Sequence, residues 1–286
     1  MHIAMLLLLF CLPAAAQLKI LAVTTAAGYL PGITKPGGIS TIFCTGLTGI
    51  SGVKRADGLP LPTTIMGVRV FVFGIPAPLL SVSDLGAYQQ INFLVPNLPD
   101  FVRTPLTVDL SQFNNSTGIK MRDRLFNGYP ADLFRDPAGF GIVQHASDYS
   151  LVTRQSPALR GELVIAYATG MGAVEPPLSS GSAAPLQPTP ALILYPGEPD
   201  GIKLFLCNPG PACEPQGQRI LATALFAGLS PGNVGVYQIN FRIPDNAPTG
   251  EVEFGVRRFY CYDAPCTLMS PFADVFESQR VKLAIQ

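Results

Sequence analysis

One short string has the residue pattern of a serine nucleophile. Gly228-Leu229-Ser230-Pro231-Gly232 matches the Gly-x-Ser-x-Gly elbow, in which a strained turn between a strand and a helix exposes the serine. Its chemistry needs a histidine within reach, and His145 is the only histidine after the N-terminal segment. Because a strand rather than a helix is predicted after Gly232, the sequence favours a Pro-Gly turn here. His145 alone is more typical of a structural or surface histidine than of a base.

Other catalytic and ligand-binding patterns are missing from the sequence. Asp132, Asp136, Asp148 and Glu175 are scattered, and neither a calcium-loop motif nor a phosphate-binding glycine motif occurs. We therefore predict a protein that is not an enzyme, with no catalytic residues, no cofactor and no metal site. A pair of carboxylates that only folding brings together remains as a hydrolase alternative.

The cysteines predict disulfides. Cys207 and Cys213 flank one Pro/Gly-rich loop, and Cys261 and Cys266 flank a second short loop. In an exported chain each spacing favours a local disulfide, although pairing between the two loops remains open. Zinc is the alternative, but no histidine lies close by. Cys44 lies in an apolar run and is predicted to be a buried free thiol.

The N-terminus has the pattern of a signal peptide. Residues 1–16 hold a short apolar run that ends in Ala14-Ala15-Ala16, which places the cleavage before Gln17. No later stretch is apolar for about 18 residues, so no transmembrane segment is expected in the mature chain. We expect a secreted protein, whether periplasmic, bound to the cell surface or released.

Composition agrees with an extracellular β-protein. Nineteen basic residues balance nineteen acidic ones, which gives no electrostatic reason to expect a nucleic-acid partner. Charged residues make up 13% of the chain, against an ordinary value of about 25%. Such a sparsely charged surface favours contact with a neighbour, so an extracellular protein or polysaccharide is the predicted partner.

Strand patterns dominate the sequence. Short β-branched and aromatic runs, separated by Gly and Pro turns, predict strands near 66–73, 90–95, 163–168, 238–243, 252–256 and 281–285. Few segments show the 3.6-residue period of a helix. The sequence therefore predicts an all-β fold built of sandwiches.

Two segments recur along the chain. Gln90-Ile91-Asn92-Phe93 returns as Gln238-Ile239-Asn240-Phe241, and 38–47 resembles 161–171. Such echoes predict two tandem immunoglobulin-like β-sandwiches, at 17–128 and 155–286, with an inter-domain turn and strand at 129–154. The Cys-bearing loops, 198–218 and 260–266, are then insertions in the second sandwich.

The recurring amides and a group of aromatic residues are the candidate site residues. We expect Gln90, Asn92, Gln238 and Asn240 to form a structural polar network with neighbouring backbone, with ligand binding as the alternative. On that basis Asn240→Ala should lower the melting temperature by several degrees. The aromatic residues in or near the insertions are candidates for ligand contact: Tyr195, Phe205, Tyr260, Tyr262 and Phe272.

A series of motifs resembles a known family. In the first unit these motifs are Pro36-Gly37-Gly38, Thr45-Gly46-Leu47, Gly74-Ile75-Pro76-Ala77-Pro78-Leu79 and Gln90-Ile91-Asn92-Phe93. In the second they are Ala168-Thr169-Gly170-Met171-Gly172-Ala173-Val174, Ala227-Gly228-Leu229-Ser230-Pro231-Gly232 and Gly235-Val236-Tyr237-Gln238-Ile239-Asn240. Together they resemble the Solibacter C-terminal domain of acidobacterial secreted proteins, and each unit is similar to an IPT/TIG-type immunoglobulin-like fold.

The resemblance implies a secreted β-rich module without assigned activity, and it supplies no site residues. Our leading hypothesis is a non-enzymatic module for extracellular or cell-surface adhesion or assembly, with the loops at 198–218 and 258–275 as its contact surface. The alternative is a polysaccharide-binding module that uses the aromatic loops of the second unit. The sequence leaves the partner, the disulfide connectivity and the oligomeric state open.

Overall fold

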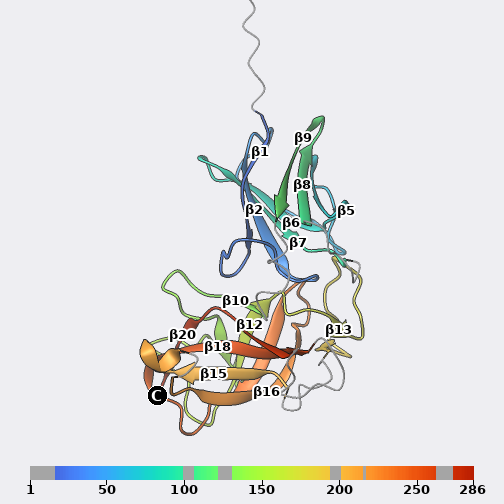
Figure 1. The fold of residues 1–286 in the computed structure, drawn as a ribbon. Coiled ribbons are helices and arrows are strands. Elements are labelled where there is room, and N and C mark those ends of the chain that lie inside the picture. The colour runs from blue at the N-terminus through green and yellow to red at the C-terminus, as the bar shows by residue number, and fades with distance from the viewer. Residues whose placement is uncertain (1–16, 99–105, 122–130, 194–200, 215–216, 262–272) are drawn as a thin grey trace, which may run out of the picture.

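The protein is almost entirely β-structure, as predicted (Figure 1). The computed structural model describes residues 17–98, 106–121, 131–193, 201–214, 217–261 and 273–286. Within these ranges every strand pair is antiparallel, and a 3-10 turn at Pro211–Cys213 interrupts the strands. None of the described segments is a helix that is long and apolar enough to cross a membrane.

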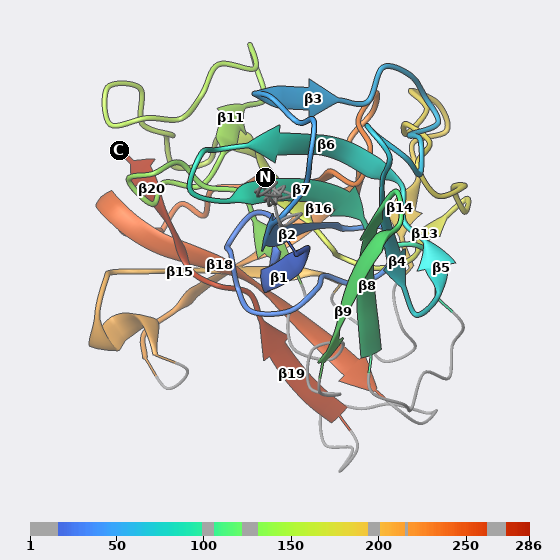
Figure 2. The same cartoon turned by 90° about the horizontal axis from the view of Figure 1, so that it is seen from above.

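The N-terminal half, residues 17–121, is a sandwich of two sheets. One sheet has the order β1-β2-β7-β6-β3 and the other the order β5-β4-β8-β9, and Figure 2 shows them as two layers. The strands of the first sheet are β1 (Lys19–Thr25), β2 (Ile39–Thr45), β3 (Val53–Arg55), β6 (Leu79–Asp84) and β7 (Gln89–Leu94). Those of the second are β4 (Val68–Val72), β5 (Ile75–Pro76), β8 (Leu106–Gln112) and β9 (Asn115–Met121).

Alternation of side chains explains this sandwich. Along β4, Val68, Val70 and Val72 are buried, whereas Arg69 between them is exposed. Side chains alternate between the two faces of a strand, so one face of each sheet supplies the shared core. Ile42 of β2 and its cross-strand partner Ile91 of β7 contribute to that core from the opposite sheet.

The C-terminal half, residues 131–286, forms one hydrogen-bonded sheet of eleven strands around a second core. The strands are β10 (Asp132–Leu133), β11 (Val143–His145), β12 (Leu163–Thr169), β13 (Val174–Glu175), β14 (Ala191–Leu192), β15 (Lys203–Cys207), β16 (Ile220–Leu229), β17 (Tyr237–Arg242), β18 (Gly250–Cys261), β19 (Ala273–Glu277) and β20 (Val281–Ile285).

This half differs from a sandwich of two separate sheets. The ten-residue β16 pairs with β15 near its start and with β17 near its end, so it joins both layers. A register shift between Ala224 and Phe226 marks the place where β16 leaves one neighbour for the other. Bulges bend a strand and increase its twist, which lets one continuous sheet curve around a core.

The segment predicted as an inter-domain connector, 129–154, belongs to this second core in its described part. β10 and β11 both pair with β12. Leu133, Val143 and Val152 are buried among residues of the C-terminal half. Their apolar side chains need a core to cover them, which is why this segment does not act as a linker.

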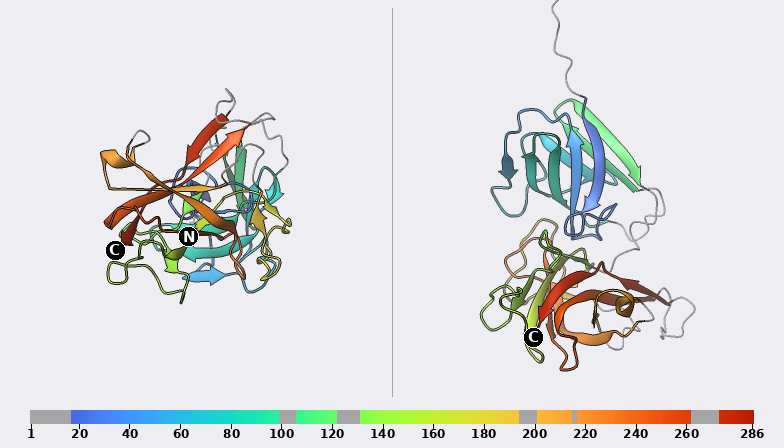
Figure 3. Two further views of the ribbon diagram at one scale, coloured as in Figure 1. Left: turned by 90° about the horizontal axis from the view of Figure 1, so that it is seen from below. Right: turned by 90° about the vertical axis from the view of Figure 1, so that its left-hand side faces the viewer.

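Both recurring sequence segments fall on paired strands in the same register. In the N-terminal half β2 pairs with β7, so that Thr41 lies opposite Asn92. In the C-terminal half β12 pairs with β17, and Ile165 lies opposite Asn240. The two halves are stacked one above the other (Figure 3, right).

Candidate functional site

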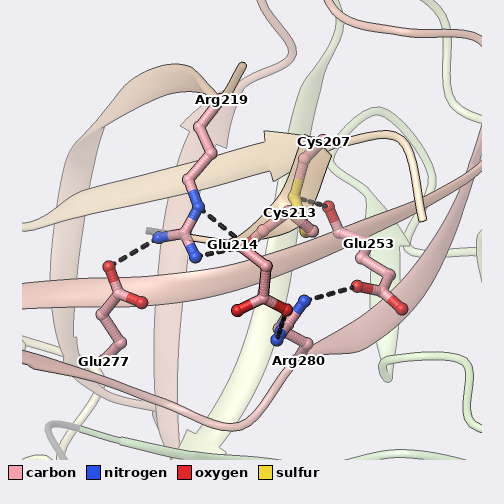
Figure 4. Close-up of a disulfide and its surroundings, with 7 residues drawn as sticks. All are labelled: Cys207, Cys213, Glu214, Arg219, Glu253, Glu277 and Arg280. Atoms are coloured by element: carbon pink, nitrogen blue, oxygen red, sulfur yellow. Dashed lines mark hydrogen bonds and ion pairs between the residues drawn. A yellow bond between two sulfur atoms is a disulfide. The ribbon is translucent and has the colours of Figure 1, made fainter. Parts of the chain in front are cut away.

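The loop after β15 is closed by a disulfide between Cys207 and Cys213, as predicted (Figure 4). Cys207 ends the strand and Cys213 ends the 3-10 turn, six residues later. Cys261 is the last residue of β18, with its side chain outside the described part, and Cys266 lies outside the described residues, so the second predicted pair is untested. Cys44 is a buried free cysteine, also as predicted, and burial raises the pKa of its thiol to about 12.

Phe205 is not an exposed ligand contact, and this prediction was wrong. Its ring is fully buried in a small cluster with Cys207 and Cys213. The Arg219 guanidinium lies 4.3 Å from the ring centroid. The physical reason is alternation along β15, because Phe205 points away from the main core and the disulfide loop folds over it. Of the other aromatic candidates, Tyr195, Tyr262 and Phe272 lie outside the described residues, and Tyr260 lies in β18 with its side chain outside them.

Ion pairs fasten the disulfide loop to the sheet (Figure 4). Arg219 Nη1 lies 2.6 Å from Glu277 of β19, and Arg219 Nε donates to the Cys213 carbonyl at 2.9 Å. Arg280 contacts Glu214 at 3.0 Å and Glu253 at 3.3 Å. Through Arg219 and Arg280, the described part of the 198–218 loop is therefore attached to β18 and β19 and covers Phe205.

The predicted polar network forms in the N-terminal half. Asn92 Oδ1 accepts hydrogen bonds from Thr41 Oγ1 at 2.8 Å and from Gln90 Nε2 at 3.0 Å. Asn92 Nδ2 donates to Ser81 Oγ at 3.2 Å. The partners are side chains of three adjacent strands rather than the loop backbone that the sequence suggested.

The equivalent position in the C-terminal half is different. Asn240 Oδ1 is buried and has no hydrogen-bond partner among the described residues. The cross-strand partner of Asn240 is Ile165 in β12, whereas the partner of Asn92 in the N-terminal half is Thr41 in β2. An isoleucine cannot donate a hydrogen bond, so the two asparagines share a position but not an environment.

Ser230 lies in a tight turn, as predicted. It follows β16, is buried, and its carbonyl accepts a hydrogen bond from the Asn233 N–H at 3.2 Å. The next element in the chain is strand β17, where a nucleophile elbow would have a helix. A buried serine on a turn between two strands lacks the exposure of a nucleophile elbow.

His145 belongs to a different arrangement, which the sequence did not reveal. Its Nδ1 lies 2.5 Å from Glu162 Oε1, and its Nε2 lies 3.3 Å from Ser156 Oγ. His145 itself is 8% exposed. Burial lowers the pKa of His145, but Glu162 and the Ser156 carbonyl outweigh burial, so its pKa lies above the ordinary value. Serine, histidine and carboxylate in this order resemble a hydrolytic triad.

The surroundings of Ser156 do not complete a triad. A triad also needs N–H groups aimed at the developing oxyanion. Residue 157 is a proline without an N–H, and the N–H groups of Ser156, Ala158 and Leu159 are bonded to Thr153, Ala284 and Glu162 respectively. In addition His145 Nε2 lies 3.2 Å from the Ser156 carbonyl, which competes with the hydroxyl. This geometry suits a histidine that fastens the loop after β11.

Metal ligation finds no support in the described part of the chain. No group of three or more His, Cys, Asp or Glu side chains gathers there in an arrangement that could hold a metal ion.

Asp132 fastens the two halves together. Its Oδ2 accepts hydrogen bonds from the N–H groups of Ala27, at 2.8 Å, and Gly28, at 3.0 Å. Gln279 Nε2 donates to the other oxygen at 2.8 Å. Asp132 is 2% exposed, and burial raises the pKa of its carboxyl, an effect that these hydrogen bonds oppose. Arg135 adds a bond to the Gly28 carbonyl at 3.4 Å.

Close backbone contact makes this junction tight. A Cβ atom built on Gly38 would lie 2.4 Å from the Cα of Gly170, closer than real side chains approach. Beside it, Thr169 Oγ1 accepts a hydrogen bond from the Ile39 N–H at 2.8 Å and donates to the Gly235 carbonyl at 2.6 Å. The segments that form this contact are motifs singled out in the sequence, Pro-Gly-Gly and Thr-Gly-Met, so their glycines permit the approach of two backbones.

Comparison with known proteins adds no relative that bears on function. No family model and no curated protein matches this sequence, so the resemblance to the Solibacter C-terminal domain remains a prediction. Among solved structures, an endo-fucoidan hydrolase from glycoside hydrolase family 107 is similar over 96% of this chain and 29% of that chain, with 10% identity and a TM-score of 0.17. A similarity this low carries no argument about activity.

Proposed function

We propose that this chain is a secreted, non-enzymatic β-module for extracellular or cell-surface adhesion or assembly. The observation that carries the proposal is the junction between the halves, in which Asp132 and the Gly38–Gly170 contact hold two β-cores against each other. These contacts oppose relative motion of the two cores, which suits a structural module that presents binding surfaces outside the cell.

Three further features support this proposal. The Cys207–Cys213 disulfide is typical of proteins from oxidising compartments. Charged residues are sparse, which favours contact with other macromolecules. Among the described residues, the cluster most similar to a catalytic site is Ser156–His145–Glu162, and its neighbouring N–H groups are already bonded within the fold.

Binding to extracellular material tests the proposal. The purified, fluorescently labelled chain would be added to intact cells of the organism that encodes it and to their isolated extracellular matrix. We expect saturable binding and no release of soluble fragments from the matrix. Absence of binding to every extracellular fraction, or release of fragments that stops when His145 is replaced by alanine, would contradict the proposed function.

A further inference from the structure

Three aromatic side chains form a cluster on the outer face of the N-terminal half. Phe43 lies in β2 between Ile42 and Cys44, which point into the core, so its ring points to the opposite face of the sheet. The rings of Tyr29 and Tyr88 lie 6.2 Å and 5.5 Å from the Phe43 ring, centroid to centroid. Tyr29 is 55% exposed and Tyr88 is 39% exposed.

Tyr29 is held in this position at a conformational cost. Its φ angle is +54°, in the left-handed region that residues with a Cβ rarely adopt. The turn around it is fixed by two bonds between Thr25 and Leu30, from the Thr25 N–H to the Leu30 carbonyl and from the Leu30 N–H to Thr25 Oγ1. Asp132 of the other half accepts the N–H of Gly28, the residue just before Tyr29. Strained residues that the surrounding structure holds in place are frequent at binding sites.

Uncharged polar groups lie next to the aromatic cluster. Phe43 pairs across the sheet with Gln90, which in turn pairs with Ser83 of β6. Gln90 donates to Asn92, which the hydrogen bonds to Thr41 and Ser81 hold in place. On its other side Phe43 pairs with Ala22 of β1. The cross-strand neighbours of Phe43 thus carry amide, hydroxyl and methyl groups and no charge.

From this arrangement we infer that the face around Tyr29, Phe43 and Tyr88 binds a neutral polysaccharide. A sugar ring presents apolar C–H groups on one face and hydroxyls around its edge. Aromatic rings cover the former, while the amide of Gln90 and the tyrosine hydroxyls can bond the latter. An acidic polymer would require several basic side chains beside the rings. The direct cross-strand partners of Phe43, Ala22 and Gln90, are uncharged, and Arg135 near Tyr29 is already bonded to the Gly28 carbonyl, which leaves Lys19 opposite Thr45 as the basic side chain on this face of β1 and β2. This inference deepens the proposed function and rests on it, because it names the extracellular polymer that the module holds.

Affinity electrophoresis of the whole chain tests this inference. The protein would be run in native gels that contain hydroxyethylcellulose, xyloglucan, glucomannan or soluble β-1,3-glucan, with alginate as the anionic comparison. We expect retardation by at least one neutral polymer and none by alginate. The double variant Tyr29→Ala/Tyr88→Ala should bind that polymer more weakly by at least about tenfold.

Tyr149 provides the matched control. It is a tyrosine with 64% exposure and a φ of +61°, and it lies in the C-terminal half, in the loop after β11. Tyr149→Ala should bind the polymer as the unaltered chain does, and all variants should keep the same melting temperature within a few degrees.

Other outcomes would overturn the inference. These are retardation by alginate alone, equal binding by the double variant, or no retardation by any polymer. If light scattering showed a dimer that the double variant loses, the face would bind a second copy instead. A chain that binds extracellular matrix but no polysaccharide would refute only this inference, whereas a chain that binds neither would refute the proposed function as well.

Discussion

Asn92 and Asn240 are both half-buried, but they differ in how many of their side-chain polar atoms have a hydrogen-bond partner. Asn92 has three side-chain partners, Thr41 and Ser81 in the adjacent strands and Gln90 in its own strand, whereas the equivalent Asn240 has an unpaired Oδ1. A buried group without a partner contributes desolvation cost and no compensating bond. Asn92 and Asn240 occupy equivalent positions in the two halves but contribute differently to the free energy of unfolding.

Replacing each asparagine by alanine should show this difference. Asn92→Ala leaves the Thr41 hydroxyl and the Gln90 amide without the acceptor that they share. We therefore expect a loss of about 1–3 kcal/mol of unfolding free energy, or several degrees in melting temperature. The sequence alone predicted such a loss for Asn240→Ala, but the structure makes the smaller effect the expected one there. Calorimetry of both variants checks this, and a greater loss for Asn240→Ala would contradict it.

The ion pair between His145 and Glu162 should make stability depend on pH. The pKa of His145 is higher in the folded protein than in the unfolded chain, where it is about 6.5. Below that pH the ion pair contributes its full stabilisation to the folded state. This contribution is lost as the pH rises through the folded pKa of His145. We expect the melting temperature to fall as the pH rises above about 6.5. Glu162→Gln should flatten this dependence; an unchanged slope in that variant would assign it to other groups.

At the scale of elements, the disulfide loop that follows β15 covers the ring of Phe205, which lies in that strand. Phe205 lies on the face of β15 that points away from the main core, and the loop closed by Cys207 and Cys213 buries it. Arg219 then connects the loop to β19 through Glu277. In the structure this loop therefore completes a small apolar cluster of Phe205, Cys207 and Cys213, separate from the main core of the C-terminal half.

Removing the disulfide should destabilise the protein moderately. Closure of so short a loop stabilises by about 2 kcal/mol, so Cys207→Ser/Cys213→Ser should lower the melting temperature by several degrees. Phe205→Ala should cost more, about 3–5 kcal/mol, because it leaves a cavity under the loop. Thermal unfolding with and without reductant checks both expectations. A reductant that lowers the melting temperature of the double variant as much as that of the unaltered chain would show that another disulfide is responsible.

At the scale of the whole molecule, the contacts of the junction connect the two β-cores. Gly38 and Gly170 bring two backbones together, and Asp132, Thr169 and Gln279 tie the surrounding loops. These contacts lie next to the turn that carries Tyr29, so the same junction positions the proposed binding face.

A single added methyl group should open this junction. In Gly38→Ala the new Cβ would meet the Gly170 backbone at 2.4 Å, and neither backbone can move away cheaply. We expect a lower melting temperature and, by small-angle X-ray scattering, a larger radius of gyration. Gly58→Ala is the matched control, because no atom lies within 4 Å of its added Cβ. Identical scattering from both variants would show that the junction tolerates the change.

Local sequence patterns determined much of this protein. Turn residues and apolar alternation predicted the strands at 163–168 and 281–285, and short cysteine spacing predicted the Cys207–Cys213 disulfide. The apolar run around Cys44 likewise predicted a buried thiol. These features depend on neighbours a few residues apart, where chain geometry leaves few choices.

Only the tertiary structure decided which residues meet. Glu162 and Ser156 join His145, Asp132 reaches Ala27 across more than a hundred residues, and Tyr29 and Tyr88 flank Phe43. Tertiary folding also buried Phe205, whose place in a Cys-bearing loop had made it a candidate for ligand contact. The reason is physical: strand register and the stacking of the two cores fix long-range contacts, and both depend on burial summed over the whole chain rather than on any short motif.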